Sequence, residues 1–229
     1  MIGFCSSLLW SPTFDRNLVA SSGAQITVLT LELGRICRTI HPSPANFQAY
    51  GHDIRNLLIL AATEAEMHFR GVLAANGATK RQRNMSDFAI LSVLMKLESY
   101  EVGFPAYPWL DTFRPFAGWK PNGSSLGWWS AYNGVKHDRD TEFDRATLLH
   151  AFEAVTACVV LLAAQFGMAA ALGSGDLARN VDITAPAEWA PSESYCGLLT
   201  ESGGEWVPAH HPELVKIVEP GKRKEMKGR

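Results

Sequence analysis

Apolar residues recur at helical spacing along the first three quarters of the chain. The clearest segment is 45–76, in which every third or fourth residue is apolar: Ile54, Leu58, Ala61, Ala65, Phe69 and Val72. This spacing places the apolar side chains on one face and predicts an amphipathic helix. The preceding segment 25–39 also fits a helix, although residues 28–33 alone could form a strand. His41-Pro-Ser-Pro44 separates the two, because proline restricts its own backbone and that of the residue before it.

Three further helices are predicted downstream. Residues 86–97 form one that starts with a Ser-Asp cap, and residues 126–139 form a short one. Residues 143–166 are apolar nearly all round, which is typical of a central core helix. The overlapping apolar run 151–172 carries polar residues, and we therefore interpret it as a buried helix rather than a membrane span: Glu153, Thr156 and Gln165.

Two segments lack this periodicity. Residues 103–125 combine prolines with large aromatic residues, and we expect this loop to lie over the core and bury its rings. Residues 173–229 are rich in proline, with a short hairpin predicted around Glu201-Ser-Gly-Gly204 and a basic tail at the end. The pattern therefore predicts an N-terminal segment at 1–19, an all-α bundle of four to five helices at 20–172, and a largely irregular extension at 173–229 packed on the bundle.

The composition narrows the class of protein. Of the 229 residues, 47 % are hydrophobic and only 19 % are charged, with a net charge of −2. This balance argues against a domain that binds nucleic acid over its whole surface. The four cysteines form no metal-binding pattern, so we expect buried thiols in a cytoplasmic protein without a metal or cofactor. Low charge and many aromatic residues favour a homodimer or a larger complex.

One segment, Trp128-Trp-Ser-Ala-Tyr-Asn-Gly-Val-Lys-His-Asp-Arg139, combines polar chemistry with large aromatic residues. At about 3.6 residues per turn, a helix brings Asn133 and His137 to one face. His137 could then act as a general acid or base, with Asn133 in support. Alternatively, both residues satisfy backbone groups where two helices meet. The other face is aromatic and is expected to point toward the core: Trp128, Tyr132, Val135 and Arg139.

Two more polar positions lie on predicted helices. Glu64 and His68 stand four residues apart at the edge of an apolar face. They could form a half-buried pair with shifted pKa values near a cleft, or simply bridge two helices. Glu64 is the residue that we expect to face His137 inside the bundle. His150 is expected to be a hydrogen-bonded histidine of the core.

The segment around His137 resembles bacterial HEPN-like proteins. The resemblance rests on the pattern Trp-Trp-x-x-Tyr-Asn-x-Val-Lys-His-Asp-Arg at 128–139, followed by Phe143-Asp-Arg-Ala-Thr147 at the start of a long apolar helix. The upstream loop ending in Pro115-Phe116 and the helix with Thr63-Glu-Ala-Glu66 fit the same resemblance. It covers roughly residues 45–170, and it implies an all-α bundle of four or five helices that is commonly dimeric.

Many HEPN proteins cleave RNA without a metal, through an Arg and a His that are separated by four to six residues. In this resemblance His137 corresponds to the histidine, which moves a proton for a ribose 2′-hydroxyl. No Arg stands five to seven residues upstream, where the chain has Ser130, Ala131 and Tyr132. Lys136 or Arg139 would have to supply the charge that stabilises the phosphate.

Two hypotheses follow. The first is a HEPN-like binding or assembly module without catalysis, in a bacterial defence or toxin–antitoxin system, and the missing Arg favours it. The second is a metal-independent endoribonuclease of the toxin-like kind, with His137 as the proton-transfer residue and RNA as the partner. Its catalytic set is His137, Asn133, Lys136, Arg139 and Glu64, and its RNA-binding set is Lys80, Arg81, Arg83 and Lys136. Between 127 and 145 the chain carries three Lys or Arg and four Asp or Glu. This slightly negative balance does not attract the phosphates of RNA.

Overall fold

A computed structural model of the chain describes residues 16–75, 85–121, 125–138, 140–172, 176–185 and 187. Helix dominates these residues, in agreement with the predicted all-α class. The helices are α1 (Arg16–Cys37), α2 (His52–Ala75), α3 (Met85–Phe88), α4 (Ile90–Leu94), α5 (Gly127–His137), α6 (Leu148–Phe166), α7 (Met168–Leu172) and α8 (Leu177–Asn180). Single 3-10 turns are η1 (Pro44–Asn46), η2 (Leu97–Ser99) and η3 (Phe143–Arg145), and two short strands are β1 (Glu101–Gly103) and β2 (Asp182–Ala185).

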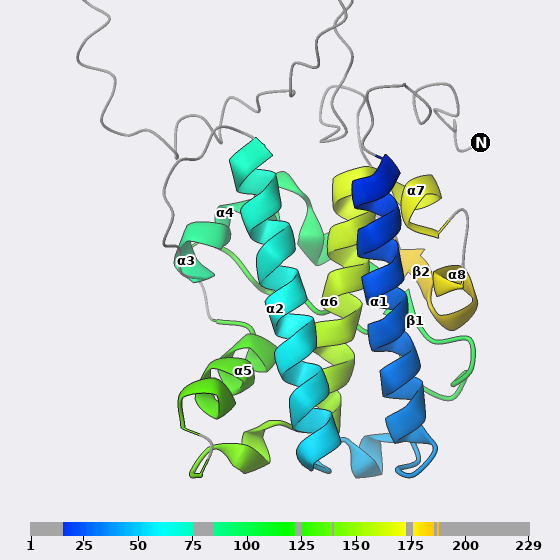
Figure 1. Ribbon diagram of the computed structural model, residues 1–229, viewed down its shortest axis with the longest axis vertical. Coiled ribbons are helices and arrows are strands. Elements are labelled where there is room, and N and C mark those ends of the chain that lie inside the picture. The colour runs from blue at the N-terminus through cyan, green and yellow to red at the C-terminus, as the bar shows by residue number, and fades with distance from the viewer. Residues whose placement is uncertain are drawn as a thin grey trace, which may run out of the picture.

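Helices α1 and α2 lie side by side and antiparallel, and α6 runs behind them (Figure 1). Because α6 is covered by both helices and by the loop that follows β1, nearly all of its side chains are buried. This confirms the prediction of a central core helix. It is the one helix among the described residues that is long and apolar enough to cross a membrane, and its burial inside the fold is typical of a soluble protein.

Helix α6 runs parallel to α2 with a constant sequence offset. The Cys158 thiol donates a hydrogen bond to the carbonyl oxygen of Ala61 at 3.1 Å, and His68 Nδ1 lies 2.8 Å from Gln165 Oε1. In both contacts the two residues are 97 positions apart. The same offset relates Tyr50 to Thr147, which form an isolated antiparallel bridge just before the two helices begin.

Two helices start later than the apolar pattern predicts. Helix α2 begins at His52 rather than near 45, and α6 begins at Leu148 rather than at 143. The reason is tertiary, because the backbone before α2 satisfies the free N–H groups at the start of α6: Leu148 donates to Ala49 and Leu149 donates to Phe47. The Thr147 side chain then accepts from the amide of His150 as a helix cap.

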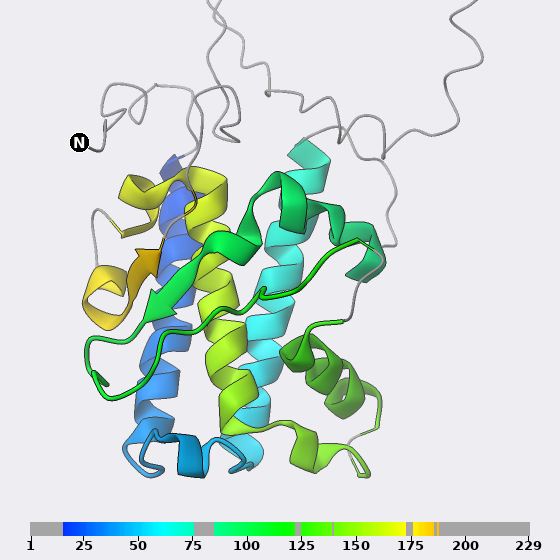
Figure 2. The ribbon, with the colours of Figure 1, turned by 180° about the vertical axis from the view of Figure 1, so that it is seen from behind.

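The described part of the aromatic segment, residues 103–121, crosses the back of α6, as seen in Figure 2. Phe113 stacks on Phe152 of α6 with ring centroids 5.0 Å apart, and Phe116 and Trp119 are buried. The predicted burial of these rings is confirmed, while Trp109 is the exception at 54 % exposed. The structure adds a small antiparallel sheet of β1 and β2 that the sequence did not predict.

The boundaries of the predicted N-terminal segment, bundle and extension differ slightly from those of the structure. Helix α1 begins at Arg16, inside the predicted N-terminal segment, and it continues through residues 28–33, so the strand interpretation of those residues is wrong. The described start of the extension packs on the bundle through α8, which contacts α1, and through β2. The predicted hairpin near 201–204 and the basic tail lie outside the described residues.

Candidate functional site on helix α5

The buried side of α5 anchors the site. Trp128, Tyr132 and Val135 are at most 2 % exposed, as the predicted aromatic face requires. Trp129 is also buried, and its ring packs against Trp128 edge to face and against Tyr132 at 5.1 Å. Aromatic rings bury large areas and so fix the helix firmly on the bundle. The opposite face of α5 is therefore held in a defined orientation.

That opposite face carries Asn133 and His137. Asn133 is half-buried, and His137 is exposed at the last residue of α5. Within the part of the chain that the structure describes, neither side chain forms a hydrogen bond or an ion pair. Both remain available to a ligand, which agrees with a polar face directed at something outside the bundle.

The side chain of Lys136 is held by contacts with Tyr132 of the same helix. Its Nζ donates to the Tyr132 hydroxyl at 2.8 Å and lies 4.9 Å from the centre of the same ring. The hydrogen bond raises the pKa of Lys136, and Glu66 of α2 raises it further. Glu66 itself accepts from Arg70 Nε at 2.9 Å. Lys136 is thus part of a cluster between α5 and α2, in which it shares the field of Glu66 with Arg70, rather than a free cation.

Arg145, which the sequence pattern does not indicate, reaches α5 from η3. Its Nη2 donates to the Ser130 hydroxyl at 2.9 Å, and its Nη1 pairs with Glu142. Gly134 makes this approach possible, because a Cβ at that position would lie 2.6 Å from Glu142 Oε2. Ser130 stands seven residues before His137, and an arginine from another segment therefore lies beside this position. No signal in the sequence indicates that η3 packs against α5.

A second arginine touches the last turn of α5. Arg55 of α2 donates from Nη2 to the carbonyl oxygen of Val135 at 3.4 Å, a long hydrogen bond. The carbonyl groups at the end of a helix carry partial negative charge, which a guanidinium stabilises. The Nε of Arg55 is buried without a hydrogen-bond partner. Arg55 therefore fastens α2 to α5 below the polar face.

Glu64 does not face His137. It lies beside His68, with Oε1 3.5 Å from Nε2, and it also acts on the thiol of Cys158 between α2 and α6. Burial lowers the pKa of His68, which keeps this histidine neutral near pH 7. Of the two readings of the Glu64/His68 pair, the structure supports the bridge between helices. Glu66 is the α2 carboxylate that faces α5.

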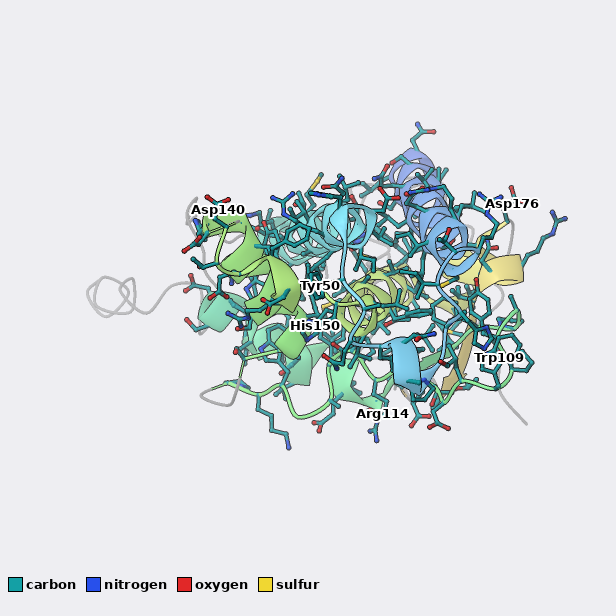
Figure 3. All side chains as sticks on the ribbon, turned by 90° about the horizontal axis from the view of Figure 1, so that it is seen from below. Tyr50, Trp109, Arg114, Asp140, His150 and Asp176 are labelled. Carbon is teal, nitrogen blue, oxygen red and sulfur yellow. The ribbon has the colours of Figure 1, made fainter. Side chains whose placement is uncertain are left out.

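His150 has the predicted hydrogen bond but lies at the edge of the core rather than inside it. It is half-buried, and its Nδ1 lies 2.7 Å from the carbonyl oxygen of Arg145. Seen from below, His150 and Tyr50 lie between Asp140 on the α5 side and Trp109 at the opposite edge (Figure 3). The exposed indole of Trp109 is therefore not part of the α5 site. It stacks on His41 at 5.3 Å instead.

The remaining predicted residues cannot be placed. Lys80, Arg81, Arg83 and Arg139 lie outside the described residues. Of the four cysteines, Cys37 and Cys158 are free and buried as predicted. Among the residues that are described, no group of three or more His, Cys, Asp or Glu side chains could hold a metal ion.

The chain was compared with known proteins in three ways. No protein-family model, no curated protein and no solved structure matches it. The fold and the α5 geometry define a mostly helical protein with a polar face on one anchored helix.

Proposed function

We propose that the protein is a HEPN-like binding or assembly module without catalysis, acting in the cytoplasm in a bacterial defence or toxin–antitoxin system. One observation carries this proposal: the described cations at α5 are already engaged within the chain. Lys136 bonds to Tyr132 near Glu66, and Arg145 pairs with Glu142. The class of module rests on the resemblance at 128–139 and agrees with the mostly helical fold.

Engaged cations are poor ligands for RNA. Binding a phosphate backbone draws its free energy from cations that replace the counterions of the nucleic acid. A cation that already faces a carboxylate gains little, because the carboxylate repels the incoming phosphate. Three further carboxylates, Asp138, Asp140 and Asp144, are exposed around this end of α5. The α5 face is therefore better suited to a protein partner than to RNA.

An RNA-cleavage assay tests this proposal. The wild-type chain and the His137→Ala variant are incubated with the same labelled RNA at matched purity. We expect equal cleavage, at the background of a buffer control. Loss of a working general acid or base slows a reaction by about 10²–10⁴-fold. Cleavage by the wild type that falls by this factor in His137→Ala would contradict the proposal and establish the second candidate.

That second candidate is the metal-independent endoribonuclease, and the position of Arg145 favours it. Ser130, Asn133 and His137 follow one another at three- and four-residue steps on α5, so the guanidinium at Ser130 lies on the side of the polar face. In this reaction His137 takes the proton of a ribose 2′-hydroxyl. The 2′-oxygen then bonds to the adjacent phosphorus, and the 5′-oxygen leaves and takes a proton from water.

Arg145→Lys separates the two roles of this arginine. A lysine keeps the positive charge but loses the planar, two-pronged donor set that binds phosphate. A ribonuclease would lose at least about tenfold in kcat. If Arg145 only holds η3 on α5, the variant changes thermal stability and leaves any cleavage unchanged.

A further inference from the structure

Three aromatic side chains form an exposed cluster at the end of the bundle where α2 begins. Phe143 of η3 lies in the middle, with the ring of Tyr50 edge to face at 6.0 Å and the ring of His52 at 5.0 Å. Tyr50 is 55 % exposed, His52 is also exposed, and Phe143 is half-buried. We call these three side chains the aromatic edge. Their ring contacts make it one continuous surface, built from two segments that are far apart in the chain.

Backbone contacts hold the aromatic edge in place. Tyr50 forms an isolated antiparallel bridge with Thr147, and the amide of Leu148 donates to the carbonyl oxygen of Ala49 at 2.8 Å. On the other side, η3 packs against α5. Figure 3 shows Tyr50 at this end of the bundle. The aromatic edge is therefore fixed on the same frame as the polar face of α5, and a surface that is already ordered loses little entropy when it binds.

The faces of these rings are not covered by a cation of the described chain. From 39 to 52 the chain carries no Lys, Arg, Asp or Glu. Among the described residues, cations lie over the rings of Phe88 and Tyr132, but over none of the three rings of the aromatic edge. A contiguous group of exposed rings is typical of an interaction surface.

The charges beside the aromatic edge are mostly negative. The segment 138–145 carries four carboxylates and two arginines. Glu142 is paired with Arg145. Asp144, next to Phe143, is exposed, and within the described part of the chain it forms no hydrogen bond or ion pair. An anionic ligand is therefore repelled here, whereas a cation meets both a free carboxylate and aromatic rings.

We infer that the aromatic edge binds an arginine-rich segment of a partner protein. A guanidinium is planar, so it stacks on an aromatic ring, and its fork of donors matches a carboxylate such as that of Asp144. Lysine offers only a point charge, and a purely apolar segment would remove water from Asp144 without supplying a counter-charge. This inference rests on the proposed function, because it names the chemistry of the partner that the module would bind.

A binding titration tests the inference. A short fluorescein-labelled peptide, in which arginine alternates with glycine, is titrated with the full chain, and fluorescence anisotropy gives the Kd. A second peptide carries lysine at the same positions. We expect the arginine peptide to bind at least about twofold more tightly than the lysine peptide. Equal Kd values for the two peptides would contradict stacking of a guanidinium on the rings.

Substitutions then locate the binding surface. Tyr50→Ala should weaken binding of the arginine peptide by about twofold to fivefold, as expected for one exposed contact between a cation and a ring. Tyr50→Phe keeps the ring and should bind like the wild type. Asp144→Asn should also weaken binding by about twofold to fivefold, because it removes one exposed ion pair.

Trp109 and Asp111 provide the matched controls. Trp109 is 54 % exposed, close to Tyr50, and Asp111 is exposed two residues further along, but neither belongs to the aromatic edge. Trp109→Ala and Asp111→Asn should leave the Kd unchanged, and circular dichroism should show equal helix content in all variants. A wild type that does not bind the arginine peptide, or equal weakening by Tyr50→Ala and Trp109→Ala, would overturn the inference.

Two further outcomes are distinguishable. Binding that appears only after Lys222, Arg223 and Lys224 have been changed to Gln would show that the chain itself occupies the aromatic edge, and would overturn the inference of a partner. The proposed function is judged by its own assay. Failure to bind the peptide leaves the absence of catalysis untouched, whereas RNA cleavage that depends on His137 contradicts the proposed function whether or not the peptide binds.

Discussion

The indole Nε1 of Trp128 donates a hydrogen bond to the carbonyl oxygen of Pro115 at 3.0 Å, and the whole of this contact is buried. Trp128 belongs to α5 and Pro115 to the aromatic loop that crosses α6. The ring of Trp128 also meets Phe116 edge to face at 6.2 Å. The orientation of the polar face of α5 thus depends on a loop that contributes no residue to it.

Trp128→Phe is expected to destabilise the protein by about 2 kcal/mol. The smaller ring leaves the buried carbonyl of Pro115 without a donor, which costs about 1–3 kcal/mol. Urea unfolding followed by circular dichroism measures the change. Trp109→Phe is the matched control, because Trp109 also donates from Nε1 to a proline carbonyl, that of Pro42, but is 54 % exposed.

At Trp109, water replaces the lost donor, so this control should cost less than about 1 kcal/mol. Equal losses in the two variants would show that the buried contact of Trp128 does not anchor α5.

Glu153→Gln is expected to change how stability depends on pH. Burial raises the pKa of Glu153 to about 7, from about 4.5 in the unfolded chain. The folded state therefore holds this proton more tightly, and the resulting stability is present at pH 4 and is lost as the pH rises through 7. Glutamine stays neutral, so the variant should gain roughly 1–2 kcal/mol over the wild type at pH 8, allowing for partial exposure.

Thermal unfolding of both proteins at pH 5 and pH 8 measures this difference. The buried His68 acts in the opposite sense: its pKa is lowered, so its contribution is lost as the pH falls below about 6.5. It is common to both proteins and cancels in the comparison. A constant gap between wild type and Glu153→Gln at both pH values would contradict the raised pKa.

Gln165→Leu is expected to cost about 1–3 kcal/mol, because it leaves Nδ1 of the buried His68 without this partner. Gln48→Leu, at an exposed position, should change the free energy of unfolding by no more than about 0.5 kcal/mol. Urea unfolding at pH 7 compares the two. If the variants behave alike, the His68–Gln165 contact contributes nothing to the α2–α6 interface.

The effect of Gly134→Ala on the free energy of unfolding should depend on whether Glu142 is present. Alanine favours a helix by about 1 kcal/mol over glycine. At Gly134, however, the added Cβ displaces the carboxylate that pairs with Arg145. We expect Gly134→Ala to leave the free energy of unfolding almost unchanged in the wild-type background. In the Glu142→Ala background, the same substitution should raise it by about 1 kcal/mol. A double-mutant cycle measures the difference, and additive effects would show that Gly134 and Glu142 are not in contact.

The sequence predicted what local patterning determines. The apolar periodicity identified α2 and α6, and the aromatic positions of α5 gave its buried face. The sequence did not predict features that depend on a distant segment. The start of α6 depends on Thr147 and on hydrogen bonds to the backbone of residues 47–49. Strand β1 pairs with a strand about 80 residues later in the chain.

The candidate site divides in the same way. Asn133 and His137 could be assigned to one face from helical spacing alone. Arg145 could not be assigned to that site, because it reaches Ser130 only through the packing of η3 against α5. Glu64 and Glu66 differ by two positions on one helix and therefore point to different neighbours, and the apolar pattern alone did not show which of them meets α5.

The constant offset of 97 residues between α2 and α6 also has a consequence for synthesis. Ribosomes add about 5–20 residues per second, so α2 waits roughly 5–20 s before the helix that covers its apolar face has been made. During that interval α1, which is made first and is joined to α2 by the segment 38–51, is the available cover. The nascent chain would thus pass through a two-helix stage, in which chaperones that bind apolar segments have time to act.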